Sequence, residues 1–267
     1  MSDESFSPEW LALREPVDHR SRAGGLIPLL NSWWAVREGS HIVDLGSGTG
    51  SNLRYLAPLL RGEQNWSLVD HDAGLLAHAA PVDGVGRIER VRGDLAREGL
   101  AAVERADLVT ASALLDLVSD AWLERLVSAC VNARCAAFFA LSYDGVTAWS
   151  DEDPEDALVL EAVNAHQRTD KGLGEALGPD AAAAAEQRFR DAGYRVWALE
   201  SQWRLDHEDP ELATQLVDGW AGAAIEMLPD DAVRIRAWRE RRQAAIVSGA
   251  FVLVVGHVDL LALPGES

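Results

Sequence analysis

Cysteine, lysine and long apolar runs are scarce in this chain of 267 residues, and each scarcity excludes a class of protein. The two cysteines, Cys130 and Cys135, lack the C-x-x-C spacing of zinc and redox motifs. We therefore expect both to be reduced and packed in the core of a cytoplasmic protein. The longest apolar run, Ala250 to Val255, is too short to cross a bilayer. The acidic, polar start of the chain does not have the pattern of a secretory signal peptide.

Positive charge is scarce as well. The chain has 24 lysine and arginine residues against 43 aspartate and glutamate residues, so its formal net charge is −19. Nucleic acid and anionic membrane surfaces would be repelled, and we expect neither as a partner. Lys171 is the only lysine. An ammonium, unlike a guanidinium, can lose its proton when it is buried, so Lys171 is a candidate for chemistry.

The stretch from His41 to Gly50 is the motif around which the rest of the predicted fold is arranged. Its sequence, HIVDLGSGTG, predicts a buried strand that runs into a glycine-rich turn, with a helix from about Ser51. Glycine suits such a turn because it tolerates a positive φ and lets a ligand approach the backbone. The dinucleotide pattern G-x-G-x-x-G would need a glycine where Ser51 stands. No Gly-Lys-Ser/Thr follows, which excludes a phosphate-binding loop.

After this turn, the sequence predicts further strands that alternate with helices. Asp70 ends a second predicted strand and lies 20 residues after Gly50, where open α/β sheets place a carboxylate against ribose hydroxyls. Strands are predicted near 41–45, 66–70, 87–92, 106–111 and 135–142, and helices near 51–60, 73–80, 95–103 and 119–133. This alternation predicts an α/β fold with a doubly wound, mostly parallel sheet and helices on both faces.

The landmarks together resemble class I, Rossmann-like S-adenosylmethionine (SAM)-dependent methyltransferases. They are the Asp44-x-Gly46-x-Gly48-x-Gly50 turn, Asp70, and the segments 91–95 and 106–112. The resemblance implies a seven-stranded sheet, SAM as the cofactor, Asp70 against the ribose and Asp94 against the adenine amino group. The cofactor-binding residues that it implies are Asp44, Gly46, Ser47, Gly48, Gly50, Asp70, His71, Gly93, Asp94, Leu95 and Ser112.

The same resemblance divides the chain. We expect a single domain over 1–267, with an N-terminal helical lid at 1–40, a cofactor-binding core at 41–145 and substrate-side insertions at 146–182 and 204–248. Three short helices are predicted before the first strand: one from Ser7 as N-cap to about Arg14, one from Pro16, and one over 26–34. By resemblance these helices fold over the cofactor, where Arg20 or Arg22 would meet its methionine carboxylate.

An added helical cap is the main departure from the resembled fold. Its last two strands, predicted here at 195–200 and 250–255, are usually joined by a short hairpin, whereas roughly fifty residues separate them in this chain. Two helices are predicted in between, over 210–228 and 231–247, and we expect them to cover the site. Five arginines give the second helix a basic face, which we expect to pair with acidic residues of the core.

Methyl transfer from SAM needs no covalent enzyme nucleophile, because the sulfonium methyl is already electrophilic. The candidate catalytic residues are His166, Asp116, Lys171 and Tyr143, and His166 suits proton transfer near neutral pH best. Asp170 is a further candidate for contact with the substrate. Histidines and cysteines do not cluster in the sequence, so no metal is predicted. The segment after Ser112 lacks the Asn/Asp-Pro-Pro-Tyr motif that would indicate methylation of nucleobases.

The favoured interpretation is a SAM-dependent methyltransferase that acts on a small-molecule metabolite, neutral or cationic in charge. One alternative is a SAM-binding regulatory protein without transfer activity, in which the space for an acceptor would be closed. The other is a nicotinamide-dependent oxidoreductase on a related sheet, against which the Ser51 mismatch argues. The sequence is compatible with a homodimer and does not decide the oligomeric state, the acceptor or the acceptor atom.

Overall fold

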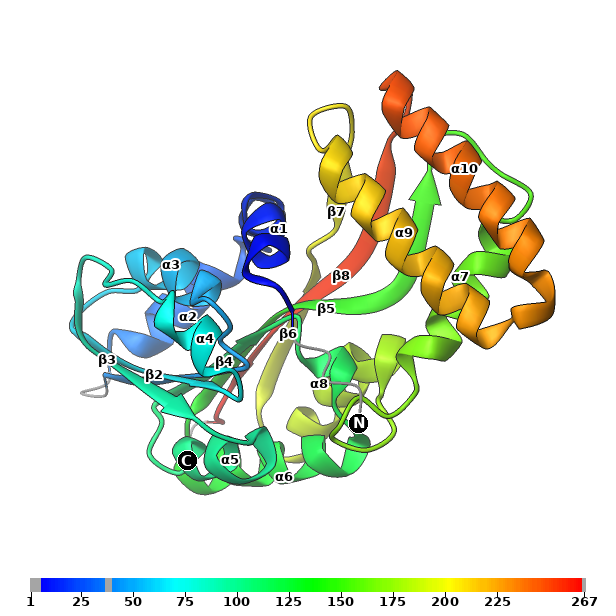
Figure 1. The fold of residues 1–267 in the computed structure, drawn as a ribbon. Helices are drawn as coiled ribbons and strands as arrows, with labels where there is room; N and C mark the ends of the chain where they lie inside the picture. The colour runs from blue at the N-terminus through cyan, green and yellow to red at the C-terminus, as the bar shows by residue number, and fades with distance from the viewer. Residues whose placement is uncertain (1–5, 37–39, 266–267) are drawn as a thin grey trace.

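One central sheet organises the computed structural model, which describes residues 6–36 and 40–265. Seven strands follow the order β3-β2-β1-β4-β5-β8-β6, and an eighth, β7, pairs with β8 beside this path. The strands, drawn as arrows in Figure 1, are β1 (His41–Leu45), β2 (Gln64–Asp70), β3 (Val85–Arg92), β4 (Leu108–Ser112), β5 (Ala136–Trp149), β6 (Arg195–Glu200), β7 (Trp203–Leu205) and β8 (Leu253–Leu263).

The strand directions confirm the predicted sheet. Strands β3, β2, β1, β4 and β5 pair in parallel with their neighbours, whereas β8 is antiparallel to β5, β6 and β7. The sheet is thus doubly wound and mostly parallel, and β7 is one short strand more than the seven predicted. A strand order that reverses beside β1 places the usual ligand crevice at the carboxyl ends of β1 and β4.

Helices cover both faces of the sheet. They are α1 (Pro8–Ser21), α2 (Leu26–Trp34), α3 (Ser51–Leu56), α4 (Ala73–Ala77), α5 (Leu100–Val103), α6 (Asp120–Ala133), α7 (Asp156–Gln167), α8 (Ala181–Asp191), α9 (Pro210–Met227) and α10 (Ala232–Ser248). Side chains of α5, α6 and α8 form one apolar core with the sheet, and side chains of α2, α3 and α4 form a second. Val43 and Leu45 belong to the first core and Ile42 to the second, as the alternation of a strand requires.

The N-terminal region differs from its prediction in one respect. Residues 8–21 form one helix, α1, instead of two separate helices, and Pro16 lies inside it. Ser7 caps this helix by accepting a hydrogen bond from the backbone of Trp10, as predicted. Proline removes one backbone donor. The Arg14–Asp18 ion pair spans Pro16, and Glu15, just before it, pairs with Arg54.

Strands β5 and β8 continue well beyond the rest of the sheet. Prediction ended β5 near 142 and placed the last strand at 250–255, whereas these strands span Ala136–Trp149 and Leu253–Leu263. Their far ends, with β7, carry α7, α9 and α10 on a third apolar core, and Figure 1 shows this unit standing to one side of the main sheet. The two predicted cap helices therefore exist, and they pack on this β5–β8 extension.

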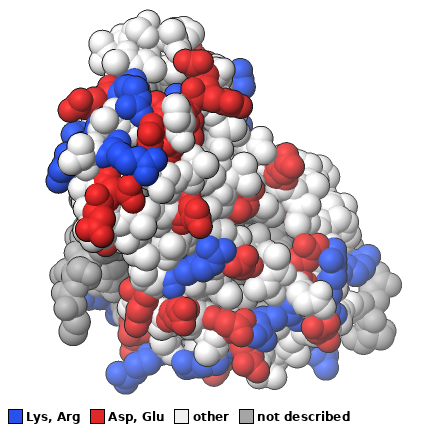
Figure 2. Space-filling view, turned by 90° about the vertical axis from the view of Figure 1, so that its right-hand side faces the viewer, with Lys and Arg blue, Asp and Glu red and all other residues white. Residues whose placement is uncertain are grey.

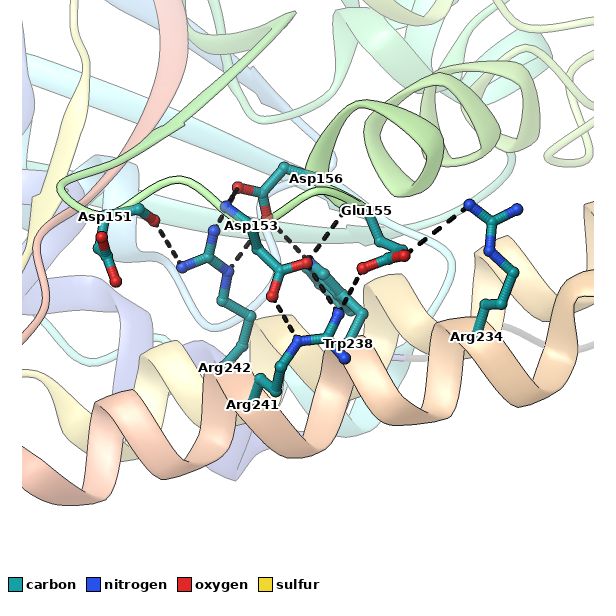
Figure 3. Close-up of polar contacts among 8 residues, drawn as sticks. All are labelled: Asp151, Asp153, Glu155, Asp156, Arg234, Trp238, Arg241 and Arg242. Atoms are coloured by element: carbon teal, nitrogen blue, oxygen red, sulfur yellow. Dashed lines mark hydrogen bonds and ion pairs between the residues drawn. The ribbon is translucent and has the colours of Figure 1, made fainter.

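Ion pairs fasten α10 to the segment before α7. Arg241 contacts Asp153 and Glu155, and Arg242 pairs with Asp156, as Figure 3 shows. Figure 2, which views the molecule from the side of α10, shows basic and acidic side chains interspersed on this face. The predicted pairing with acidic residues is confirmed for Arg234, Arg239, Arg241 and Arg242. Most of the partners lie in the acidic segment 151–156 and not in the core, whereas Arg239 pairs with Asp218 of α9.

Candidate active site

A cavity of about 1140 Å³ lies at the carboxyl ends of β1, β2, β3 and β4. Residues from the turns after these four strands line it, together with residues of α1 and of the loop after α7. Among the predicted cofactor-binding residues, Gly50 does not line it and the following do: Asp44, Gly46, Ser47, Gly48, Asp70, His71, Gly93, Asp94, Leu95 and Ser112. The landmarks found along the sequence thus converge on one space.

The glycine-rich turn needs its glycines. Gly46, Gly48 and Gly50 have φ values of 63°, 52° and 81°, in the left-handed region that other residues rarely adopt. A Cβ on Gly48 would lie 3.3 Å from Leu11 Cδ1, and one on Gly46 would lie 3.2 Å from Leu114 Cδ1. The turn therefore presents bare backbone to the cavity.

Asp70 holds this turn in place. Its Oδ2 accepts a hydrogen bond from the Gly48 amide at 2.8 Å, and its Oδ1 accepts one from the Asp72 amide at 2.9 Å. Each carboxylate oxygen can accept a second hydrogen bond. Asp70 is therefore able to bind a hydroxyl group in the cavity while it fixes the loops after β1 and β2.

Asp44 is buried at the end of β1 and has one oxygen free of hydrogen bonds. Asn52 donates to its Oδ1 at 2.8 Å, whereas Oδ2 has no hydrogen-bond partner among the described residues. Burial raises the pKa of Asp44 to about 7, against the hydrogen bond from Asn52 and the charge of Arg22, which lower it. Ser47 Oγ, which also lines the cavity, is likewise buried without a partner in the described chain.

A buried polar chain runs behind Asp44. The Asn52 side-chain oxygen accepts a hydrogen bond from Arg22 at 3.1 Å, and Arg22 pairs with Asp259 of β8 at 3.3 Å. Asn52 also donates to Thr110 of β4 at 2.8 Å. This chain ties the end of α1 to three strands of the sheet and orients the Asp44 carboxylate.

The N-terminal cation at the cavity is Arg14, which sequence reasoning missed. Arg14 and Asp18 of α1 both line the cavity. Arg14 donates to both oxygens of Asp18, and its guanidinium lies over the ring of Trp203, 5.0 Å from the ring centre. Arg20 and Arg22, which were expected to meet the methionine carboxylate, do not line the cavity. Arg20 pairs with Asp209, and Arg22 is buried in the polar chain behind Asp44.

The four predicted catalytic residues separate into two groups. Lys171 lines the cavity, and His166 lies directly behind it, with 3.4 Å between Lys171 Nζ and His166 Nδ1. Asp116 and Tyr143 are buried and do not line the cavity. Burial raises the pKa of Asp116 to about 6 and raises the pKa of Tyr143 as well, and Tyr143 donates to Asn164 Oδ1 at 2.9 Å.

Three other observations bear on the predictions. No residue of α9 or α10 lines the cavity, so the two cap helices do not cover it as expected. Within residues 6–36 and 40–265, no three histidine, cysteine, aspartate or glutamate side chains come together as a metal site. Over the same ranges, no helix is both long enough and apolar enough to span a membrane.

Comparison with known families fits this geometry. Residues 42–134 match the family model described as "Methyltransferase domain". This segment is a methyltransferase domain. It extends from β1 to the end of α6 and supplies the glycine-rich turn, Asp70, Asp94 and Ser112. The family resemblance drawn from the sequence is thereby confirmed. The cavity-lining residues between Asp44 and Leu117, called the inner wall below, all belong to this methyltransferase domain.

Solved structures share the fold of the whole chain. The cyclopropane synthase MmaA2 from Mycobacterium tuberculosis aligns with a TM-score of 0.50 at 10% identity, over 96% of this chain and 94% of that one. A SAM-dependent methyltransferase from Thiobacillus denitrificans, solved with S-adenosyl-L-homocysteine, aligns with a TM-score of 0.44 at 16% identity, over 96% and 98% of the two chains. Comparison with curated proteins gave no match. At such identities the likeness concerns the fold alone.

Proposed function

We propose that the protein is a SAM-dependent methyltransferase that transfers a methyl group to a small-molecule acceptor. The observation that carries the proposal is the free, buried Oδ2 of Asp44 on the same cavity as the Asp70 carboxylate and the bare glycine turn. A buried carboxylate oxygen without a donor is costly unless a ligand supplies one.

The chemistry of the cavity residues fits SAM group by group. Asp44 suits the ammonium of the methionine moiety, and Arg14 suits its carboxylate. Asp70 suits the ribose hydroxyls, because hydroxyl groups donate to carboxylates. Asp94 and Leu95 line the region that the family resemblance assigns to adenine. When bound, SAM would supply a methyl group on an electrophilic sulfonium.

The residues of this chain would then bind SAM, align the acceptor with it and exclude water from the cavity. Alignment of an acceptor with the methyl carbon in a water-poor space accounts for much of the rate of such reactions. The cavity, at about 1140 Å³, exceeds the roughly 300–1,000 Å³ of sites for single small ligands. An acceptor therefore has room beside the cofactor, and this room favours transfer over a purely regulatory, SAM-binding role.

Calorimetry tests the proposal without knowledge of the acceptor. SAM and S-adenosylhomocysteine (SAH) should bind one site per chain, and NADH should not bind. Incubation with methyl-labelled SAM and a panel of small metabolites should then release SAH with some of them. Binding of NADH in preference to SAM would support the oxidoreductase alternative, and binding of neither would overturn the proposal.

A further inference from the structure

Lys171 occupies an ordered position at the edge of the cavity. It belongs to the loop between α7 and α8, and this loop is anchored on the segment before α6: the Leu177 amide donates to Val118 O at 2.9 Å. Within the loop, Asp170 Oδ1 accepts hydrogen bonds from the amides of Gly172 at 2.7 Å and Gly174 at 3.1 Å. The backbone around Lys171 is therefore held by the protein's own contacts.

The ammonium of Lys171 has no ion pair among the described residues. Its polar contact is with His166 Nδ1, and His166 Nε2 lies 3.3 Å from Glu226 Oε2. Both contacts are favourable when the imidazole is neutral, with its proton on Nε2 toward Glu226 and its Nδ1 lone pair toward Lys171. The histidine thus accepts one of the three N–H donors of the ammonium and leaves the other two.

Among the described residues, the two other cations that line the cavity are Arg14 and Arg92. Arg14 is paired with Asp18 and is the residue proposed for the methionine carboxylate of the cofactor. Arg92 donates to the backbone of His71 and lies at the end of β3, beside the segment assigned to adenosine. Lys171 is therefore the cation available on the acceptor side of the cavity.

Apolar side chains share this side with Lys171. Leu173 follows it on the same loop, and Leu117 directly precedes the segment to which the loop is anchored; both line the cavity, as does Leu114. Lys171 is half-buried, and an anionic ligand that displaces water from its ammonium gains a charge-assisted hydrogen bond. An uncharged ligand would lack this gain.

We propose that Lys171 is the anchor for an anionic group, a carboxylate or a phosphate, on an acceptor that has an apolar body. The proposal deepens the proposed function and rests on it, since the anchored acceptor would share the cavity with the cofactor. His166 and Glu226 are positioning residues, which hold the ammonium without touching the acceptor. The overall charge of −19 led to the expectation of a neutral or cationic acceptor, and the local cation at Lys171 replaces that expectation.

The single lysine makes a direct test possible. Binding of SAH is measured first by calorimetry, which tests the proposed function separately. The SAH-saturated protein is then treated with an amine-acylating reagent, alone or with phenylacetate, phenyl phosphate or the uncharged phenylacetamide, and acylation of Lys171 is followed by mass spectrometry. The α-amino group of the chain is acylated in the same reaction and serves as an internal control.

Either anion should slow the acylation of Lys171 about tenfold at a concentration ten times its dissociation constant. Phenylacetamide should leave the rate unchanged, and the α-amino group should show no protection. Lys171→Gln should abolish binding of the anion measured by calorimetry, whereas Lys171→Arg should retain most of it. The matched control is Arg168→Gln, because Arg168 lies on the same segment, pairs with the exposed Asp180 and does not line the cavity.

Three results would overturn the anchor while leaving the cofactor proposal standing. They are SAH binding without protection by either anion, equal protection by phenylacetamide, and unchanged anion binding in Lys171→Gln. Glu226→Gln separates positioning from a merely structural role: it should weaken anion binding while SAH binding and thermal stability stay unchanged. A failure of SAH to bind would count against the proposed function and, with it, against this inference.

Discussion

Asn52 of α3 holds one oxygen of Asp44 at the end of β1, with 2.8 Å between its side-chain nitrogen and Asp44 Oδ1. Its own oxygen is fixed in turn by Arg22. The Asp44 carboxylate is thereby oriented so that its Oδ2 is left for a ligand. Without the hydrogen bond from Asn52, burial would favour the protonated form of Asp44 still more. A residue outside the glycine-rich turn thus determines how the turn's neighbouring acid is presented.

Replacing Asn52, which also lines the cavity, should weaken cofactor binding because it removes the donor that orients Asp44. Hydrogen bonds to charged groups contribute about 1.5–3 kcal/mol, so Asn52→Leu should lower the affinity for SAH by roughly ten- to hundredfold in calorimetry. Asn65→Leu is the matched control, because Asn65 donates to Ser40 at the opposite end of β2. An equal loss in both variants, or none in Asn52→Leu, would contradict the positioning role.

Cofactor affinity should depend on pH through Asp44. Its pKa is about 7 in the free protein because the group is buried, so the carboxyl is largely protonated below that pH. An ammonium ligand requires the ionised form, and the affinity for SAH should therefore fall about tenfold for each unit between pH 7 and pH 5. Asp44→Asn should bind weakly and lose this dependence. A flat profile in the unchanged protein would remove Asp44 from the ammonium site.

The free energy of unfolding should also depend on pH through Asp44. Since the pKa of Asp44 is raised above its ordinary value of 3.8, the folded state binds more protons than the unfolded chain between about pH 4 and pH 7. The contribution of Asp44 to stability therefore falls as pH rises through this window. Urea unfolding should show Asp44→Asn gaining stability relative to the unchanged protein from pH 4 to pH 8; a constant difference would contradict the raised pKa.

Much of the inner wall of the cavity could be predicted because its signals are local. The glycine turn, Asp70 and the segment 93–95 each follow a strand whose hydrophobic pattern is evident, and parallel strands bring their carboxyl ends together. Helix α2 was predicted at its observed bounds. Short-range patterns and general α/β topology are sufficient for these elements.

The part of the cavity wall that α1 supplies could not be predicted, because it depends on contacts between distant segments. Arg14 and Asp18 reach the cavity through packing of α1 against Trp203, 185 residues after Asp18. The lengths of β5 and β8 are set by their pairing with one another, for example Trp149 with Leu253, and neither segment alone indicates them. The position of the cap helices followed from that extension, which is why they were wrongly expected over the site.

Substitution of Asp70 should affect both the loop and the ligand. The family resemblance places Asp70 against the ribose, and the structure shows that Asp70 also accepts the amides of Gly48 and Asp72. Each buried donor left unpaired costs about 1–3 kcal/mol, so Asp70→Ala should lower the free energy of unfolding measurably as well. Asp70→Asn keeps one acceptor and should lose SAH affinity with a smaller loss of stability. Full SAH affinity in Asp70→Asn would exclude Asp70 from the cofactor site.

The β5–β8 extension offers a test of stability that is independent of the cavity. Arg242 is buried at 4% exposure; it pairs with Asp156, donates to Asp151 O at 2.8 Å and lies over Trp149, whereas the neighbouring Arg241 makes its ion pairs at 46% side-chain exposure. Breaking a buried pair leaves an uncompensated charge and costs about 3–5 kcal/mol, whereas an exposed pair contributes about 0–1 kcal/mol.

Arg242→Met should therefore lower the free energy of unfolding in urea far more than its matched control, Arg241→Met. Both variants should bind SAH unchanged while they remain folded, because neither arginine lines the cavity. Similar losses in the two variants would mean that the network in Figure 3 stabilises α10 through its exposed charges. Loss of SAH binding at a temperature where Arg242→Met is still folded would instead show that the cap and the cavity are coupled.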